Sequence, residues 1–125
     1  MLDFAYAPYS DYQVGACILT DDGGIFTGCN VENASYGATI CAERAAVCAM
    51  VSAGTRRIRK IAIAGRSGTA WPCGICRQIL NEFQGADGVM VICESPDSDI
   101  VSIPLSELLP HAFGRAALNG DAGDY

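Results

Sequence analysis

Cysteines open both of the long helices that the sequence predicts. Residues 41–54, CAERAAVCAMVSAG, are rich in alanine and end in glycine, which predicts a helix with a C-terminal stop. Residues 73–83, CGICRQILNEF, predict a second helix, and Pro72 suits its first turn. Free backbone N–H groups and a positive dipole end gather where a helix begins, and both favour a thiolate. These sulfurs can act together only in a fold that brings the two helix starts close to one another.

The spacing of these cysteines points to a metal. Cys73 and Cys76 lie about one helical turn apart, so both sulfurs can point to one place. Alone, this CxxC spacing fits a redox pair, half of a zinc site or two packed cysteines. Cys41 at the other helix start favours zinc, because three thiolates leave one tetrahedral position open, as in catalytic zinc sites. His111, the only histidine, could instead close a structural site, but we expect it to have no metal role.

Two charged residues follow Cys41 closely. Glu43 is too near Cys41 to ligate the same ion comfortably and near enough to reach a water on it. The plainer alternative is an acid in the first helical turn, favoured by the helix dipole. Arg44 could donate to the sulfurs and offset their net negative charge, or form an ordinary surface ion pair. We expect Glu43 to be catalytic and Arg44 to support the ligands.

The rest of the chain predicts an α/β fold with a mixed sheet. Apolar, β-branched stretches predict strands, and the DDGG sequence at residues 21–24 predicts a hairpin turn. A short helix is expected at 105–110, and a flexible tail from about residue 118. The order of elements predicts helices packed against a mixed sheet of about five strands, in one domain spanning residues 1–125. The expected strands are residues 14–20, 25–30, 58–65, 89–94 and 100–104.

Composition limits the partners. The chain has 125 residues, half of them hydrophobic, which fits a globular domain and excludes a disordered one. No apolar run reaches the ~20 residues that span a bilayer, and no secretory signal opens the chain, so we expect a cytoplasmic protein without membrane contact. A formal net charge of −6 argues against a nucleic-acid partner. The other cysteines are expected to pack as small apolar side chains: Cys17, Cys29, Cys48 and Cys93.

The segments CAER and PCGICRQ together resemble the zinc-dependent cytidine deaminase family, in its small homotetrameric branch. The similarity continues through AYAPYSDYQVGA, FTGCNVENASYG and SIPLSELLPHAF, from Ala5 to Phe113. It implies helices on both faces of the sheet and one Zn²⁺ per subunit, held by three cysteines. The implied reaction is hydrolytic deamination of cytidine and deoxycytidine to uridine and deoxyuridine plus ammonia, in pyrimidine salvage. Water activated on zinc would be the nucleophile and Glu43 the proton shuttle. The ligand positions fall on Cys41, Cys73 and Cys76, with Arg44 bonded to the thiolates.

The resemblance also implies the substrate contacts. Asn30 and Glu32 would bind the ribose, where a carboxylate accepts a hydroxyl but repels a phosphate, so we expect a nucleoside substrate. Tyr12 stands where the family usually has phenylalanine, beside the sugar and base, and its hydroxyl changes the polarity of that wall. Phe113 and Tyr36 would be supplied across subunit interfaces of the homotetramer. Turn chemistry for Asn30 and Glu32, and core packing for Tyr12, are the plainer alternatives.

Two other functions compete with this one. A structural zinc module for protein interaction would close the fourth metal position and need no role for Glu43. A related zinc deaminase acting on a cytosine nucleoside analogue such as blasticidin S would keep the chemistry, although NVENASYG resembles a nucleoside-binding loop. Family members also carry a helix before the APYS segment, where this chain has only MLDFAY before Ala7, so we expect one sheet face to have less cover and the tetramer to be weaker.

Overall fold

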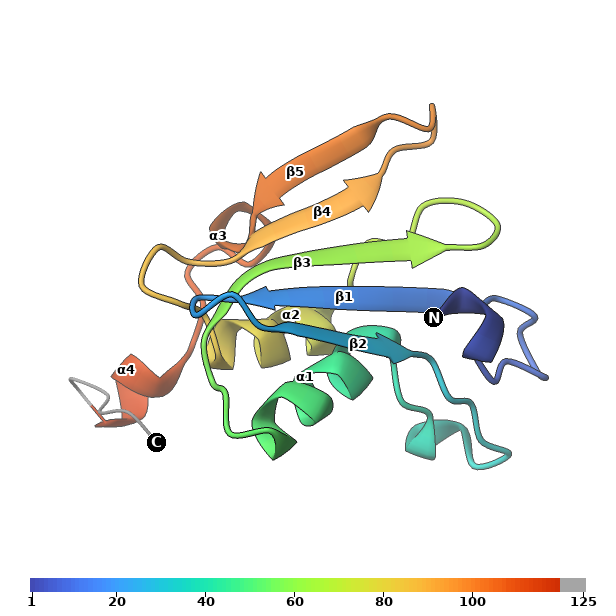
Figure 1. Cartoon of the computed structure of the whole chain (residues 1–125), viewed down its shortest axis with the longest axis horizontal. Helices are drawn as coiled ribbons and strands as arrows, with labels where there is room; N and C mark the ends of the chain where they lie inside the picture. The colour runs from blue at the N-terminus through green and yellow to red at the C-terminus, as the bar shows by residue number, and fades with distance from the viewer. Residues whose placement is uncertain (120–125) are drawn as a thin grey trace.

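Five strands form one mixed sheet in the computed structural model, which describes residues 1–119 (Figure 1). The strand order is β2-β1-β3-β4-β5, with β3 and β4 parallel and the other neighbours antiparallel. The predicted five-stranded sheet is confirmed, and three of its strands have the expected bounds. The strands are β1 Val14–Thr20, β2 Ile25–Cys29, β3 Ile58–Gly65, β4 Met90–Glu94 and β5 Ile100–Pro104.

Two long helices connect the parallel strands. Helix α1 spans Ala42–Ser52 and helix α2 spans Gly74–Glu82, so Cys41 and Cys73 are the N-cap residues of these helices. None of the described helices has the length and apolar character needed to cross a bilayer. The expected tail from residue 118 overlaps a short helix that was not predicted, α4, and otherwise lies outside the described residues. The shorter helical elements are η1 Leu2–Phe4, η2 Tyr36–Ala38, α3 Leu105–Leu108 and α4 Arg115–Asn119.

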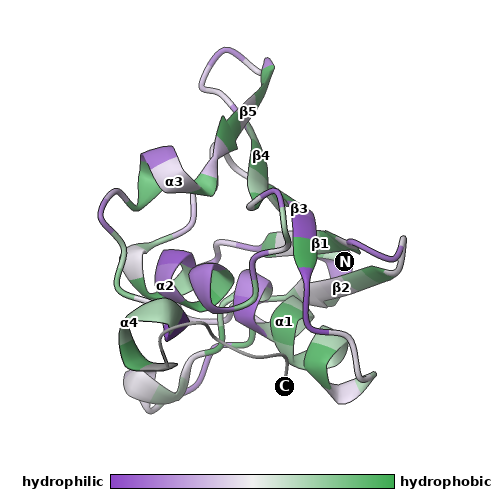
Figure 2. Cartoon of the chain, turned by 90° about the vertical axis from the view of Figure 1, so that its left-hand side faces the viewer, coloured by the Kyte–Doolittle hydropathy of each residue, from purple (hydrophilic) through white to green (hydrophobic). Residues whose placement is uncertain are grey.

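Both long helices cover the same face of the sheet, and of the helices expected on its two faces the short η1 lies on the other (Figures 1 and 2). Strands β2 and β3 are each antiparallel to β1, and β4 is parallel to β3, so β2, β3 and β4 run in one direction. The chain also moves across the sheet in one direction through these strands. Two right-handed crossovers therefore place α1 and α2 on one face. On the opposite face, Leu2 of η1 lies near Gly15 of β1.

The core lies between this face of the sheet and the two helices. Alternate strand residues such as Ile18, Ile61 and Val91 are buried against Met50 of α1 and Leu80 of α2. Because α1 follows β2 and α2 follows β3, both helices begin at the edge where these parallel strands end. This topology brings the two cysteine-bearing helix starts together.

Candidate active site

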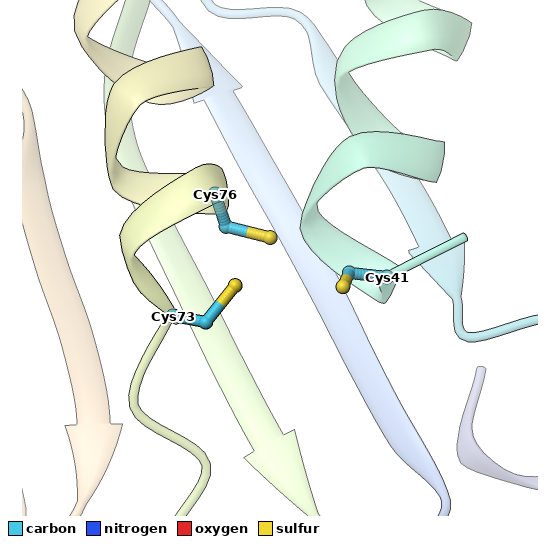
Figure 3. A group of neighbouring side chains, drawn as sticks. All are labelled: Cys41, Cys73 and Cys76. Atoms are coloured by element: carbon cyan, nitrogen blue, oxygen red, sulfur yellow. The ribbon is translucent and has the colours of Figure 1, made fainter. Parts of the chain in front are cut away.

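Three cysteine sulfurs converge between the starts of α1 and α2 (Figure 3). The Sγ atoms of Cys41, Cys73 and Cys76 all lie within 4.8 Å of one another. Zn–S bonds of about 2.3 Å in tetrahedral geometry separate the sulfurs by about 3.8 Å, so only a small contraction would suit the ion. The donor set therefore fits one Zn²⁺, and the predicted meeting of these sulfurs is confirmed.

The backbone leaves these sulfurs free to face one another. Cys41 has φ −73° and ψ 153°, and Cys73 has φ −70° and ψ 171°, the extended conformation usual at an N-cap. An N-cap side chain commonly accepts a hydrogen bond from its own helix, but neither cysteine makes one. Cys76 lies in the first turn of α2 and is fully buried. Each thiol therefore points away from its helix axis towards the shared centre (Figure 3).

One thiolate is favoured in this cluster even without an ion. A hydrogen bond from Cys76, with further help from Arg44, lowers the pKa of Cys41 to about 5. The same bond to Cys41, followed by burial, raises the pKa of Cys76. Cys76 thus keeps its proton and donates it in a hydrogen bond to the sulfur of Cys41, which carries the negative charge. A cation that ligates both sulfurs takes the place of that proton, which is the usual linkage between metal binding and thiol deprotonation.

Arg44 lies against the cluster as the sequence suggested. Its Nη2 donates to the Cys41 sulfur at 3.4 Å and to the Thr39 carbonyl at 2.9 Å. Its Nε is buried and has no hydrogen-bond partner within the described part of the chain. The guanidinium is therefore turned inward towards the thiolate, unlike that of a surface ion pair.

Glu43 lies on the wall of a pocket of about 400 Å³ in front of the cluster. The pocket is also lined by Cys41, Cys73, Tyr12 and Asn30, and its size suits one small organic ligand. The Glu43 side chain is only 6% exposed, and burial raises the pKa of its carboxyl. A buried carboxyl beside a metal-binding cluster and an open pocket is well placed to exchange protons with a bound molecule.

The other expected substrate residues are divided between three places. Tyr12 and Asn30 line the pocket itself, whereas Glu32 and Tyr36 line a neighbouring hollow of about 290 Å³ that shares Thr39 with it. Phe113 is 60% exposed and lines neither of these two cavities. His111, which we expected to have no metal role, lines a separate hollow beside α4.

Asn30 and Glu32 already hold the segment before β1. The Asn30 Oδ1 accepts from the Val14 amide at 3.0 Å, and its Nδ2 donates to the Tyr12 carbonyl at 2.8 Å. Glu32 Oε1 accepts from the amides of Tyr9 at 2.9 Å and Ser10 at 3.1 Å. The Ser10 hydroxyl donates to Oε2, and this bond lowers the pKa of Glu32. Both side chains therefore support the pocket wall through local hydrogen bonds, the kind of role that the alternative of turn chemistry had suggested.

Arg77 fixes the chain before the metal cysteines, a role that was not predicted. Its Nε donates to the Pro72 carbonyl and its Nη1 to the Leu108 carbonyl, both at 2.8 Å. The signal that could have found Arg77 is its place in PCGICRQ, one residue after a predicted ligand. Its partner Leu108 is 31 residues away, so the bond itself could not be predicted.

The fold and the site together define an α/β protein in which three cysteines beside a pocket can hold one metal ion and would leave one of its coordination positions open. Residues 2–93 match the family model of the cytidine and deoxycytidylate deaminase zinc-binding region, and the chain belongs to this family of zinc-dependent deaminases. The resemblance seen in the sequence is thereby confirmed.

Curated relatives and solved structures agree with this membership. The chain is 47% identical over 111 residues to a cytidine deaminase of Mycobacterium tuberculosis, covering 88% of this chain and 79% of the relative. It is 46% identical over 116 residues to a cytidine deaminase of Halalkalibacterium halodurans, covering 92% and 87%. A crystal structure of cytidine deaminase from Burkholderia pseudomallei aligns with a TM-score of 0.80 at 43% identity, covering 90% of each chain.

Proposed function

We propose that this chain hydrolyses the exocyclic amine of cytidine and deoxycytidine, giving uridine or deoxyuridine and ammonia. The observation that carries the proposal is the placement of the buried Glu43 carboxyl on one pocket wall with the sulfurs of Cys41 and Cys73. The names of the relatives support the substrate class. These two cysteines and Cys76 would hold the Zn²⁺, which when bound would make its water acidic enough to lose a proton near neutral pH.

In this proposal Glu43 moves the protons. In zinc deaminases a glutamate that is not a ligand serves as general acid and base. The Glu43 carboxylate takes a proton from the attacking water and gives it to ring N3 of the pyrimidine. The water oxygen bonds to C4, and Glu43 then takes the remaining proton of this new hydroxyl and delivers it to the exocyclic amine. The C4–N bond breaks, ammonia leaves, and the C4 carbonyl of the product forms. Burial supports this cycle because the raised pKa of Glu43 brings its protonated form closer to neutral pH.

The residues around the pocket orient the nucleoside. Glu32 accepts the ribose 3′-hydroxyl through Oε2, which has a lone pair left beside its bond from Ser10. Asn30 has one N–H left for the sugar after its bond to Tyr12. The carboxylate charge of Glu32 repels a phosphate on the sugar, which favours nucleosides over nucleotides. The ring of Tyr12 forms the wall beside the base and sugar.

We further propose a cytoplasmic homotetramer that serves pyrimidine salvage, built from one domain per chain. Tyr36 is 75% exposed and Phe113 is 60% exposed, which suits aromatic rings that are covered by a neighbouring subunit. In that assembly Phe113 reaches the pocket of a neighbouring subunit and stacks on the base. One hydrophobic cluster, joining the sheet to α1 and α2, supports the single domain.

An ammonia-release assay on cytidine, with zinc measured on the same sample, tests the proposed activity. We expect Glu43→Gln to keep its zinc and lose at least about 10²-fold in turnover, because general acid–base catalysis is removed. Glu107→Gln is the matched control, an exposed acid in the first turn of α3. Turnover of Glu43→Gln at the wild-type rate, or no ammonia from the zinc-loaded wild type, would contradict the proposal.

A further inference from the structure

The loop of residues 66–72 leads from β3 to the first metal cysteine of α2. Three of its carbonyl groups, those of Thr69, Ala70 and Pro72, accept hydrogen bonds from side chains of other segments. These donors fix the path of the chain just before Cys73. The bonds are Tyr12 Oη to Thr69 O at 2.8 Å, Cys93 Sγ to Ala70 O at 3.6 Å, and Arg77 Nε to Pro72 O at 2.8 Å.

Of these donors, Tyr12 also belongs to the pocket wall and is itself held in place. Its backbone amide donates to the Ser10 hydroxyl oxygen at 3.1 Å, and its carbonyl accepts from Asn30 Nδ2 at 2.8 Å. The residue therefore joins the segment before β1, the loop after β2 and the loop before α2. Movement of the Thr69 carbonyl is therefore opposed by Ser10 and Asn30, which hold Tyr12 in place.

A glycine makes room for the Tyr12 hydroxyl. A Cβ added at Gly65, the last residue of β3, would lie 2.7 Å from the Tyr12 hydroxyl oxygen and 2.9 Å from the Gly68 carbonyl. Real Cβ atoms do not come so close to an oxygen. The hydroxyl thus fills space that only glycine leaves open at this strand end, beside the irregular Gly65–Gly68 bridge.

We propose that the Tyr12 hydroxyl is a positioning group for the metal loop. By holding the Thr69 carbonyl, it fixes the chain four residues before Cys73 and keeps that sulfur turned towards Cys41 and Cys76. Phenylalanine at position 12 preserves the ring wall but leaves the Thr69 carbonyl without this donor and lets the loop relax. The proposal goes beyond packing against substrate, because it assigns the hydroxyl to metal retention. It rests on the zinc site of the proposed function and not on turnover.

The test is the rate of zinc release from the zinc-loaded protein to an excess of a chromogenic chelator. We expect Tyr12→Phe to release zinc about five-fold faster than the wild type, the factor that one ordinary net hydrogen bond carries. Tyr6→Phe is the matched control, because Tyr6 is 55% exposed and lines neither the pocket nor the metal loop. We expect this control to release zinc at the wild-type rate.

A second variant disturbs the same hydrogen bond without changing Tyr12. Gly65→Ala displaces the Tyr12 hydroxyl and is expected to accelerate zinc release as well. The melting temperature of each metal-free variant is measured alongside. A lowered melting temperature of Tyr12→Phe with zinc release at the wild-type rate would show a role in general stability only and overturn the proposal. Equal acceleration in Tyr6→Phe would overturn it too. Because zinc release needs no turnover, these outcomes do not depend on whether the protein deaminates cytidine.

Discussion

Arg44 and Cys41 lie one helical turn apart at the start of α1, with the guanidinium Nη2 3.4 Å from the cysteine sulfur. The same nitrogen donates to the Thr39 carbonyl at 2.9 Å, so the cation is anchored on the chain that enters the helix. Three thiolates with one Zn²⁺ carry a net charge of −1, which would make a bound water less acidic. The position of Arg44 reduces this negative charge directly at one of the sulfurs.

Removal of this guanidinium should weaken zinc binding. We expect Arg44→Ala to lower zinc affinity about ten-fold, as loss of a partner bonded to a ligand commonly does. Competition with a chelator of known affinity measures the change. Arg59→Ala serves as control, since Arg59 is exposed on β3 and lies away from the cluster. Equal affinities for Arg44→Ala and the wild type would show that the contact does not support the site.

Each metal cysteine should be required for zinc. We expect Cys73→Ser to reduce bound zinc from about one ion per chain to nearly none and to abolish ammonia release, because a neutral hydroxyl is a poor zinc ligand. Cys48→Ser is the matched control, an exposed cysteine farther along α1. Elemental analysis together with the cytidine assay checks both effects. Full activity of metal-free protein, prepared by chelation, would contradict the prediction.

The sequence predicted the strands and the two helix starts well because their signals are local. Apolar β-branched runs mark the buried strands, and Pro72 followed by Cys73 marks the start of α2. Helix α4, Arg115–Asn119, was missed because five residues hold too little apolar periodicity to be recognised. Which face each long helix covers could not be predicted from local patterns, because it depends on the order and direction of the strands.

The metal cysteines were predictable for the same reason, while the supporting bonds were not. Cys41, Cys73 and Cys76 stand at helix starts that can be read from the chain, and they do meet. The bond from Tyr12 to Thr69 joins residues 57 positions apart, and the bonds of Glu32 to Tyr9 and Ser10 span 23 and 22. Such contacts follow from the path of loops in space, which composition and spacing do not encode.

Glu32 should set the preference for a nucleoside. The Ser10 hydroxyl holds the pKa of Glu32 below its usual range, so this carboxylate is ionised at pH 5 and above. We therefore expect little turnover of CMP. We also expect the KM for cytidine to stay constant between pH 5 and 8, because Glu32 remains ionised over this range. In Glu32→Gln we expect the KM for cytidine to rise about ten-fold and the discrimination against CMP to fall. Steady-state kinetics on both substrates measure these effects.

Asp11→Asn is the matched control for this prediction. It removes an exposed carboxylate from the same segment without touching the Glu32 bonds, and asparagine tolerates the positive φ of 55° at this position. We expect its kinetics to match those of the wild type. Comparable kcat/KM values of the wild type for cytidine and CMP would contradict the argument from charge.

Buried Cys93 should make stability fall at alkaline pH. Burial, with a smaller contribution from the charge of Glu43, raises the pKa of Cys93 from 9.0 to about 11. The neutral thiol is thus favoured in the folded state, so its stabilising effect is complete below pH 9 and is lost as pH rises through 11. This shift of two pKa units corresponds to about 2–3 kcal/mol of unfolding free energy. Denaturant unfolding at pH 8, 9, 10 and 11 measures this slope.

Comparison with Cys93→Ala isolates the contribution of this one thiol. Other groups that titrate in the same range are common to both proteins, and the lost methyl-sized volume lowers stability equally at every pH. We expect the variant to lose about 2 kcal/mol less between pH 9 and pH 11 than the wild type does. Parallel pH profiles for the two proteins would mean that Cys93 does not titrate differently in the folded and unfolded states.

Gly28 of β2 should control how closely α1 approaches the sheet. A Cβ at this position would lie 2.5 Å from the Ala46 amide nitrogen and 2.6 Å from the Ala42 carbonyl oxygen. Both are backbone atoms of α1, so no side-chain rotation can relieve the clash and the whole helix must move. We expect Gly28→Ala to lower stability by about 1–3 kcal/mol, nearer the upper value, and to lower the melting temperature by roughly 5–10 °C.

The same displacement should reach the metal site, because Cys41 is the N-cap of α1 and moves with it. We therefore expect Gly28→Ala to bind zinc more weakly as well as to melt earlier, whereas a purely local defect would affect melting alone. Gly37→Ala is the matched control, since an added Cβ there meets nothing within 4 Å. Calorimetry of the metal-free proteins and chelator competition measure the two effects. A melting temperature of Gly28→Ala equal to that of Gly37→Ala would show that α1 does not pack against β2 as closely as the structure has it.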